Sequence, residues 1–446
     1  MDRSMEQISK ERLWIYEKIF NGLSFTEYMK SLVTPFNMIA VILILPGLSF
    51  IVNRYLYGLG AVTNASDVYP WGLFISYGLL SGVPFSSTGF IMATAYYIFG
   101  LKTYRPIVRL GILVGLLGYF FAVCFLLVDL GRPWRLPYPM FVSLGTASVL
   151  FLVAWHVALY LSTQFVEFCP SIFEWLGAER CRSWAAKLTI GATIFGVILS
   201  TLHQSALGAL FLLMPGKVHP LWYSSFLPVY FFVSSIFAGL SVIILVSSLC
   251  RRFLRDKTDA DFNTKFDAMI LGLGKAASVV LFSYYSLKLI SVAHENQWEL
   301  LITPYGSLFL LEIVGFVFLP CLLYAYGVKM KNVSIVQVTS VLTMLGIVFN
   351  RFNVSMIGFN WTLPHREIPH WKEFFIGIAI VTIGVLVFRW IVSRLPVLRE
   401  LPKYPRPPKL KEEAFEGVRP SYLRLPRIAY GSIQLMNETI KNWKGA

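Results

Sequence analysis

The sequence predicts an all-α protein that crosses a membrane about ten times. Hydrophobic residues make up 56% of its 446 residues and charged residues only 14%, and the mean hydropathy is +0.63. Polytopic membrane proteins reach these values and soluble domains do not. The chain also contains ten apolar runs of about 20 residues, the length that a helix needs to span a bilayer. They lie at 36–56, 71–99, 107–128, 140–161, 188–213, 224–249, 268–292, 305–327, 334–350 and 372–393.

One run and both chain ends depart from this pattern. The second run contains Gly82 and Pro84, which favour a kinked or partly unwound helix. Residues 1–35 have apolar side chains at roughly helical spacing and are expected to form a cytoplasmic amphipathic segment at the membrane surface. Residues 394–446 form a basic, Pro-rich cytoplasmic tail, a composition that argues against a packed domain. The predicted transmembrane domain therefore covers 36–393.

Lysine and arginine predict the orientation of the runs. Most of the lysine and arginine residues outside the runs lie in the two chain ends and the even-numbered loops, which share one side of the membrane. The same holds when the tail is left out. Positively charged loops stay in the cytoplasm, so both termini are predicted there. This topology explains the net charge of +15 better than a nucleic-acid-binding face does. On the same side, aromatic residues among polar ones predict a membrane-surface helix within 163–187.

The cysteines and histidines argue against a metal cofactor carried by the chain itself. The five cysteines form no Cys-x-x-Cys pair and no ferredoxin-like run, so we expect neither disulfides nor an iron–sulfur cluster. A b-type haem usually needs two histidines at one depth on facing helices. Only His156 and His203 lie within the runs, the first toward an inner end and the second toward an outer end. We therefore expect no haem, and any electrons must come from a partner.

Polar and ionisable residues gather toward the outer ends of several runs. Such groups are costly inside a bilayer, and proteins keep them when they are paired, hydrated or used. The outer loops and run starts supply Tyr69, Trp71, Asp129, Arg132 and Tyr138. The later runs and their outer ends supply His203, Gln204, Ser205, Lys288, Glu312, Arg351 and Asn353. Separate helices would thus bring acids, bases and hydrogen-bonding groups to a similar depth.

This set suits a quinone headgroup, which has two carbonyl oxygens and takes up two protons on reduction. Histidine exchanges protons near neutral pH, so His203 is the predicted proton donor or acceptor. Asp129 would orient it or relay its proton, while Arg132 and Arg351 would polarise the headgroup. The apolar walls would accommodate the isoprenoid tail.

Glu312 and Lys288 are predicted to form the next step of a proton path. Structural explanations exist beside the chemical ones: Glu312 and Lys288 can form a buried ion pair, and Arg132 can reach lipid headgroups. His203 can make an ordinary hydrogen bond between helices. The inner half of the runs offers no evident chain of acids, so a path to the cytoplasm stays an open question.

Five short motifs resemble the NrfD/polysulfide-reductase membrane-subunit family, and within it the branch of the hydrogenase-2 membrane subunit (HybB-like). The most specific is Ser200–Gly208 (STLHQSALG), which is followed by Lys217–Trp222 (KVHPLW). The others are Tyr69–Leu73 (YPWGL), Asp129–Pro133 (DLGRP) with Tyr138 close behind, and Asn350–Ser355 (NRFNVS). The resemblance covers nearly the whole predicted transmembrane domain.

The resemblance implies a cofactor-free subunit that binds menaquinone or ubiquinone near the periplasmic face of a bacterial inner membrane. A four-cluster ferredoxin-like iron–sulfur subunit would dock outside, together with a catalytic subunit such as a nickel–iron hydrogenase, a molybdenum oxidoreductase or a multihaem cytochrome. The core would resemble two four-helix bundles, with two helices added. The family's quinone-site roles would fall on His203 and Asp129, and further on Arg132, Tyr69 and Arg351.

Two other functions are compatible with parts of the sequence. A secondary transporter would use broken helices and polar groups at the membrane midplane, which fits the kinked second run but not the clustering near one face. A mere membrane anchor of an enzyme would tolerate substitutions at His203 and Asp129. The joint pattern of ionisable groups favours the quinone-binding subunit, with proton translocation as an added expectation.

Overall fold

The computed structural model describes residues 17–20 and 22–399, and the chain divides into two compact units. The larger unit is Pro35–Leu401. In the described part of the other unit, the short helix α2 (Phe25–Ser31) begins with a capping box formed by Ser24. About half of the predicted amphipathic segment (residues 1–16 and 21) and almost all of the basic tail (residues 400–446) lie outside the described residues.

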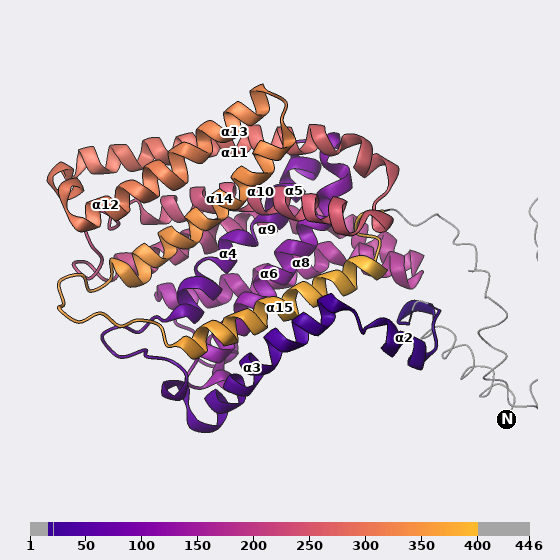
Figure 1. Ribbon diagram of the computed structural model, residues 1–446, viewed down its shortest axis with the longest axis horizontal. Helices are drawn as coiled ribbons and strands as arrows, with labels where there is room; N and C mark the ends of the chain where they lie inside the picture. The colour runs from indigo at the N-terminus through magenta and orange to yellow at the C-terminus, as the bar shows by residue number, and fades with distance from the viewer. Residues whose placement is uncertain (1–16, 21, 400–446) are drawn as a thin grey trace, which may run out of the picture. The chain divides into compact units, whose positions relative to one another are not determined.

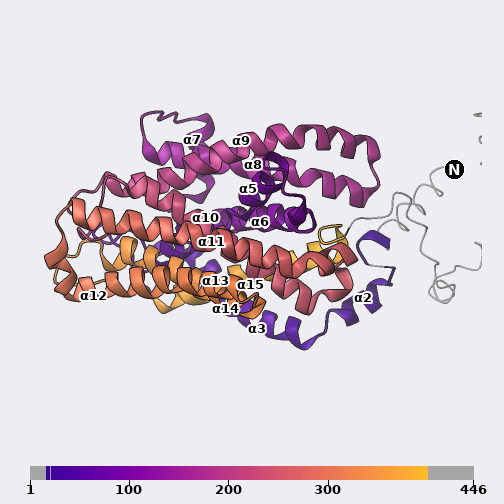
Figure 2. The ribbon, with the colours of Figure 1, turned by 90° about the horizontal axis from the view of Figure 1, so that it is seen from above.

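Among the described residues, nine helices are long and apolar enough to cross a membrane. Figures 1 and 2 show them running side by side in roughly one direction. The chain is therefore a polytopic, all-helical membrane protein, as predicted. The nine are α3 (Pro35–Tyr57), α6 (Arg105–Asp129), α8 (Val149–Leu176), α9 (Glu179–Leu212), α10 (Leu227–Phe253), α11 (Ala260–His294), α12 (Pro304–Leu310) continued through η8 (Leu311–Phe318) into α13 (Leu319–Lys329), α14 (Val333–Phe352) continued by η9 (Asn353–Ile357), and α15 (Trp371–Arg394).

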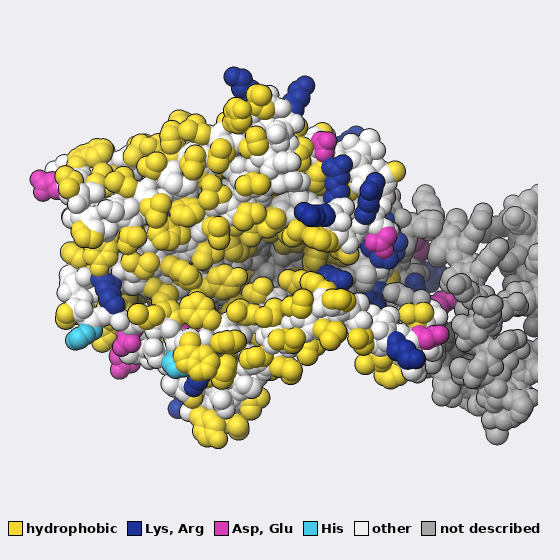
Figure 3. Space-filling view, viewed as in Figure 1, with side chains coloured by type: hydrophobic (Ala, Val, Ile, Leu, Met, Phe, Trp, Pro, Cys, Tyr) yellow, Lys and Arg dark blue, Asp and Glu magenta, His cyan; other side chains and the backbone are white. Residues whose placement is uncertain are grey.

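The two ends of these helices differ in charge. Following the predicted orientation, we call the end that holds the last residues of α6, α9 and α14 the outer end, and the opposite one the inner end. In Figure 3, hydrophobic side chains cover the visible flank of the helices, as a lipid-facing surface requires. Lysine and arginine gather on the right of that view, at the inner end where α10 turns into α11.

The predicted second span is a broken helix. It consists of η2 (Phe74–Leu79), α4 (Gly82–Phe85), α5 (Thr88–Ala93) and η3 (Thr94–Ile98), of which η2 and η3 are π-helical. Pro84 explains the break, because it has no N–H to donate to the carbonyl of Leu80. Before it, the helix widens, and the Leu80 N–H bonds the carbonyl of Ile75 at 2.8 Å. The predicted kink is confirmed, and this segment accounts for the difference between ten predicted spans and nine continuous ones.

The helices pack into two groups of four. The first group is the broken helix (residues 74–98), α6, α8 and α9, in which α6 and α9 each contact both the broken helix and α8. The second is α10, α11, the α12–α13 span and α14, in which α11 and α14 each contact both α10 and the α12–α13 span. Because α10 also contacts α9 and the broken helix, the two groups share one core. The remaining pair, α3 and α15, packs mainly on itself and on α6, at the lower flank in Figure 1. This arrangement agrees with two four-helix bundles and two added helices.

The inner connection between α8 and α9 differs from the prediction. α8 continues to Leu176, α9 begins at Glu179, and the tight turn between them uses Gly177 with a φ of +75°. The surface helix predicted within 163–187 is therefore the prolongation of two spans. Because α8 begins only at Val149, His156 lies in its outer half and not toward an inner end.

Five short 3-10 turns and one single-turn α-helix lie in the loops of the described chain. None of them is long enough to cross a membrane. They are η1 (Leu59–Ala61), η4 (Lys102–Tyr104), η5 (Pro133–Arg135), η6 (Arg255–Lys257) and η7 (Trp298–Ile302), together with the single-turn helix α7 (Tyr138–Phe141).

Gly239 lies where α10 crosses the broken helix. A Cβ at this position would lie 2.7 Å from Ile91 Cδ1 and 3.0 Å from the backbone carbon of Ser87. We expect Gly239→Val to lower the free energy of unfolding by about 1–3 kcal/mol, the usual cost of overpacking a tight core. Gly191→Val is the matched control, because a Cβ there has nothing within 4 Å. Thermal unfolding of both variants in detergent measures the difference, and equal melting temperatures would contradict the close crossing.

Candidate functional site

His203 is fully buried in α9. Its Nδ1 atom is hydrogen bonded to the hydroxyl of Tyr119 on α6 at 2.9 Å. Its Nε2 atom is also buried and has no hydrogen-bond partner in the described part of the chain. With Tyr119 donating to Nδ1, a neutral ring carries its proton on Nε2, so that His203 presents an unused N–H donor.

Four more polar side chains surround this pair. Gln164 Nε2 donates to the hydroxyl of Tyr160 at 2.7 Å, and Gln204 Nε2 donates to the carbonyl of Val83 in the broken helix at 3.1 Å. Within the described residues, Gln164 Oε1, Ser200 Oγ and Gln204 Oε1 are buried without a partner. A buried polar atom left unsatisfied costs about 1–3 kcal/mol, so four of them together indicate a place that binds water or a polar ligand. We define the His203 group as Tyr119, Tyr160, Gln164, Ser200, His203 and Gln204.

The His203 group lies at mid-depth and not at the outer face. Tyr119 is near the middle of α6, and Asp129 is its last residue. The two are separated by about ten residues, or about 15 Å along a helix. The structure therefore does not bring Asp129 next to His203, and Tyr119 occupies the position beside Nδ1 that was expected for Asp129.

Asp129 lies in an outer cluster with Arg54 and Glu373. Arg54 on α3 donates to the carbonyls of Val128 and Leu130, on either side of Asp129. Both Arg54 and Glu373 interact electrostatically with Asp129. This cluster holds the outer end of α6 against the α3–α15 pair.

Glu373 opens α15 and is fully buried. Its Oε2 atom accepts a hydrogen bond from the Leu73 N–H at 2.6 Å, and its Oε1 atom accepts one from the His370 N–H at 2.9 Å. A Cβ on Gly72 would lie 2.5 Å from Oε2, so the backbone approaches this carboxylate as only glycine permits. Glu373 thus ties the start of the broken helix to the start of α15.

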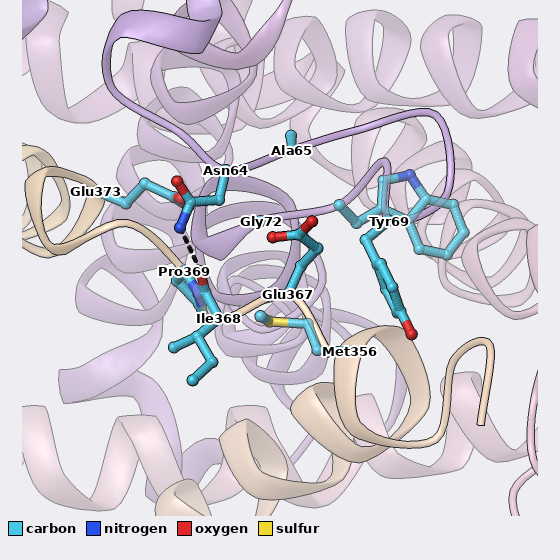
Figure 4. Close-up of a pocket in the computed structure, with 10 residues that line it drawn as sticks. Asn64, Ala65, Tyr69, Gly72, Met356, Glu367, Ile368, Pro369 and Glu373 are labelled. Carbon is cyan, nitrogen blue, oxygen red and sulfur yellow. Dashed lines mark hydrogen bonds between the residues drawn. The ribbon is translucent and has the colours of Figure 1, made fainter. Parts of the chain in front are cut away.

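Two predicted residues, Tyr69 and Trp71, line a small pocket beside Glu373 (Figure 4). The pocket holds about 10 Å³, which is room for about one water molecule. The Tyr69 hydroxyl donates to the carbonyl of His365 at 2.8 Å, and the ring of Trp71 packs edge-on against Phe211. The pocket is too small for a quinone headgroup, so these residues close the outer surface.

Glu312 forms a second buried group, nearer to the outer end than His203. It lies in the π-helical segment η8 and is 1% exposed. Its Oε2 atom accepts from Trp222 Nε1 at 2.9 Å and from Asn353 Nδ2 at 2.7 Å, and its Oε1 atom accepts from Asn350 Nδ2 at 2.6 Å. Three neutral donors therefore hold this carboxylate in place. We call Trp222, Glu312, Asn350, Arg351 and Asn353 the Glu312 group.

Arg351 connects the Glu312 group to the broken helix. Its guanidinium donates to Asn350 Oδ1 at 2.6 Å, to Ser234 Oγ at 2.8 Å and to the carbonyl of Leu80 at 3.1 Å. The last bond replaces the one that Pro84 cannot make. Its guanidinium carbon also lies 3.7 Å from the centre of the Phe231 ring.

Lys288 is buried close to the Glu312 group without joining it. Its Nζ atom lies 4.5 Å from the centre of the Tyr230 ring, and it interacts electrostatically with Glu312. None of the ion pairs in the described chain joins Lys288 to Glu312. The buried ion pair considered from the sequence is therefore not formed, and aromatic rings surround this cation instead.

The remaining predicted residues lie away from both groups. Arg132 and Tyr138 are exposed in the outer loop, where the guanidinium of Arg135 lies over the Tyr138 ring at 5.3 Å. Ser205 is half-buried on α9, next to the fully buried Gln204. The motif residues thus separate into an exposed loop, an outer cluster and two buried groups.

Sequence reasoning missed Tyr119, Tyr160, Gln164 and Glu373. Tyr160 and Gln164 are four residues apart, so they share one helix face, and this polar pair within an apolar run was an available signal. The spacing of His370 and Glu373 is that of a capping box. Tyr119 gave no signal, because a single tyrosine in an apolar run is common in membrane helices.

The reason given against a haem needs correction. His156 and His203 were expected at different depths, but His156 lies in the outer half of α8 and interacts electrostatically with His203. In the described structure, the ring of Tyr119 packs on His203 at 5.4 Å and on Tyr160 at 4.6 Å and fills the space beside His203. In the described residues, no cluster of three or more metal-ligating side chains exists.

His219 lies in the outer loop between α9 and α10, above the Glu312 group. Its ring packs against Tyr305 at 4.6 Å, Trp361 at 4.8 Å and Trp222 at 5.6 Å. Burial, helped by the nearby charge of Arg366, lowers the pKa of His219 to about 4. It is therefore neutral at pH 7 and acts as an apolar lid over Trp222.

The lowered pKa of His219 predicts a pH dependence of stability. An unfolded chain protonates this histidine near pH 6.5, whereas the folded protein does so only near pH 4. The contribution of neutral His219 to the free energy of unfolding is complete above pH 6.5 and is lost as the pH falls toward 4. The melting temperature of the wild type should therefore fall more steeply over this window than that of His219→Asn. Substitution of the exposed His294 by Asn serves as the control, and parallel curves for wild type and His219→Asn would contradict the assignment.

Comparison with known proteins identifies the family. The polysulphide reductase, NrfD, family matches residues 61–361. A protein of Nitratidesulfovibrio vulgaris is 49% identical over 377 residues, which cover 84% of this chain and 97% of the relative. The probable Ni/Fe-hydrogenase 2 b-type cytochrome subunit of Escherichia coli is 30% identical over 356 residues, covering 79% and 89% of the two chains.

A further relative carries a quinone in its name. The menaquinone reductase, integral membrane subunit, of Nitratidesulfovibrio vulgaris is 22% identical over 375 residues, covering 76% of this chain and 86% of the relative. The family match includes the broken helix, both buried groups and most of the outer loops. This chain, a multi-pass integral membrane protein, belongs to the NrfD polysulphide reductase family.

Proposed function

We propose that this chain is the quinone-reactive membrane subunit of a respiratory oxidoreductase complex in a bacterial inner membrane, with both termini in the cytoplasm. It would exchange electrons between a periplasmic iron–sulfur or haem subunit and menaquinone or ubiquinone. The family membership and the relatives named for a hydrogenase and for a menaquinone reductase support this assignment. Hydrogenase, molybdenum-enzyme and multihaem-cytochrome partners all fit it.

The observation that carries the proposal is the buried, unpartnered Nε2 of His203 within the described chain. A quinone would supply two carbonyl acceptors and the two-electron, two-proton couple. His203 Nε2–H would donate to one carbonyl oxygen and deliver its proton there. Tyr119, bonded to Nδ1, would fix the tautomer of the ring and return a proton to it. Ser200 and Gln204 would fix the orientation of the headgroup.

The other predicted residues take roles set by their depth. Arg351 and Glu312 would hold the polar network between the His203 group and the outer end, with Asn353 and Lys288 beside them. Asp129, with Glu373, would serve proton exchange at the outer surface, about 15 Å from the His203 group. Asp129 is thus proposed as an outer proton site and no longer as the direct relay of His203.

A secondary transporter is the second candidate, and one observation favours it. The broken helix passes beside polar groups at mid-depth, which is the arrangement that transporters use. Uptake of a solute by vesicles that contain this chain alone, without an electron donor, would support that function. Quinone-linked electron transfer in the purified complex would support the first.

Substitution of His203 tests the proposed function. In the complex purified with its partner subunits, His203→Ala should slow menadione reduction at least about a hundredfold, the scale of lost general acid–base catalysis. Tyr119→Phe keeps the ring and removes the hydroxyl, so we expect a smaller, about tenfold, loss. Activity of the partner with an artificial electron acceptor should not change in either variant.

Thr201→Ala is the matched control for these variants. Thr201 lies on the same turn of α9, and its hydroxyl bonds the carbonyl of Val197 within its own helix. It should keep the full rate. Undiminished menadione reduction in His203→Ala would remove His203 from the mechanism and favour a purely structural anchor.

A further inference from the structure

Glu167 is a buried acid in the inner half of α8, where the sequence had offered no evident acid chain. Its side chain is 5% exposed, and its Oε1 atom accepts a hydrogen bond from Thr193 Oγ1 on α9 at 2.7 Å. None of the ion pairs among the described residues includes Glu167. An acid without a cation inside a membrane span is costly, which makes a structural role a poor explanation for it.

Glu167 stands at the inner end of two facing polar stripes. On α8, Tyr160, Gln164 and Glu167 follow one another at spacings of four and three, so they share one face of the helix. On α9, the same spacings connect Thr193, Gly196, Ser200 and His203 along one face. The two helices pack along their lengths, so the stripes face each other. They join the acid to the His203 group.

Glycines let the polar side chains of the two stripes approach the neighbouring helices closely. A Cβ on Gly196 would lie 4.0 Å from Glu167 Oε2 and 3.6 Å from the ring of Tyr160, so both side chains border the same gap. A Cβ on Gly115 would lie 2.6 Å from Gln164 Nε2, which shows that the amide fits only because a side chain is absent there. Within the described residues, Gln164 Oε1 is buried here without a partner, which is the condition under which a water is held.

The outer part of the route is a series of neighbouring polar side chains, in which two hydrogen bonds are joined by a contact between aromatic rings. Gln164 Nε2 donates to the Tyr160 hydroxyl at 2.7 Å, and the rings of Tyr160 and Tyr119 pack at 4.6 Å. Ser200 approaches the hydroxyls of both tyrosines. Tyr119 then bonds His203 at 2.9 Å. Hydroxyl groups both donate and accept, so this series can pass a proton from one to the next.

The inner part of the route begins at a cavity. A cavity of about 430 Å³ opens between the broken helix, α6 and α11, and Tyr97 and Arg109 lie in its wall. Tyr97 interacts electrostatically with both Arg109 and Glu167, which relates the acid to the cavity wall. Arg109 is fixed by an ion pair with Glu174 at 2.8 Å. This cavity is the inner entrance that the proposed route requires.

We propose that Glu167 is a proton-loading site that supplies the His203 group from the inner aqueous side. This inference rests on the proposed function. For each quinone reduced by two electrons from an iron–sulfur or haem partner, two protons are taken up. The Glu167 carboxyl gives up each proton through held water and the hydroxyls of Tyr160 and Tyr119, and His203 passes it to the carbonyl oxygen. Glu167 regains a proton from water in the inner cavity, so quinone reduction moves positive charge from the inner side into the membrane.

The test measures which compartment supplies the protons. The complex with its partner subunits is placed in vesicles whose lumen faces the inner end, with menaquinone in the membrane and a pH-sensitive dye in the lumen. Electrons are supplied from outside. The wild type should consume protons from the lumen as electrons enter. Glu167→Gln should reduce this uptake at least about tenfold, because the acid that loads the route is lost. Thr193→Val, which removes only a hydrogen bond, should reduce it severalfold.

Glu179→Gln is the matched control, because Glu179 is an exposed acid at the start of α9, paired with Arg182 at 3.0 Å. It should leave uptake unchanged. Full luminal proton uptake in correctly assembled Glu167→Gln, with uptake lost in His203→Ala, would overturn the inner route and leave the proposed function standing. Absence of quinone reduction in the wild type would overturn the proposed function and this inference with it.

Discussion

A backbone carbonyl that loses its helical donor inside a membrane finds no water to replace it. Pro84 creates this situation at Leu80, and the guanidinium of Arg351 supplies the missing donor. Three residues further on, the carbonyl of Val83 accepts from Gln204. The broken helix is therefore held from one side by α14 and from the other by α9. Neither the break nor the two buried polar groups is stable without the others.

The two buried acids of the core are held in different ways. Glu312 accepts hydrogen bonds from three side chains, and the amide oxygen of one of them, Asn350, accepts in turn from Arg351. Such a carboxylate is a rigid acceptor that organises Asn350 and Arg351 around it. Glu167 accepts one side-chain bond and borders a gap. The first arrangement suits positioning, and the second suits repeated loss and recovery of a proton.

The sequence predicted the fold well, because spans in a membrane are long apolar segments with little else to explain them. It also predicted the break at Pro84 and the importance of His203. The prediction was wrong where it depended on the depth of a residue in the membrane. The run that contains His156 was ended too early, because polar residues such as Gln164 and Glu167 were assigned to a loop when they continue α8 inward. The same error hid the inner acid and placed His156 on the wrong side of the midplane.

The hydrogen-bond partner of His203 could not be predicted either, and the reason is different. Which residue of α6 meets His203 depends on how far two helices are shifted along each other, and composition does not record that shift. The sequence favoured Asp129, an ionisable residue at the end of α6, over a tyrosine in the middle of that helix. The structure shows that the tyrosine makes the contact. Similarly, the three donors to Glu312 come from elements far apart in the chain, so only packing brings them together.

The α8–α9 hairpin described above is longer than a bilayer requires. The 34 residues of α9 extend over about 51 Å at the rise of an α-helix, whereas the hydrocarbon core is about 30 Å thick. Tilt alone does not fit a helix pair of this length into the hydrocarbon core, so its tip at Gly177 extends past that core at the inner end. Glu167 lies ten residues before that tip, about 15 Å along the helix, so the hairpin brings a buried acid within a short distance of the inner aqueous phase.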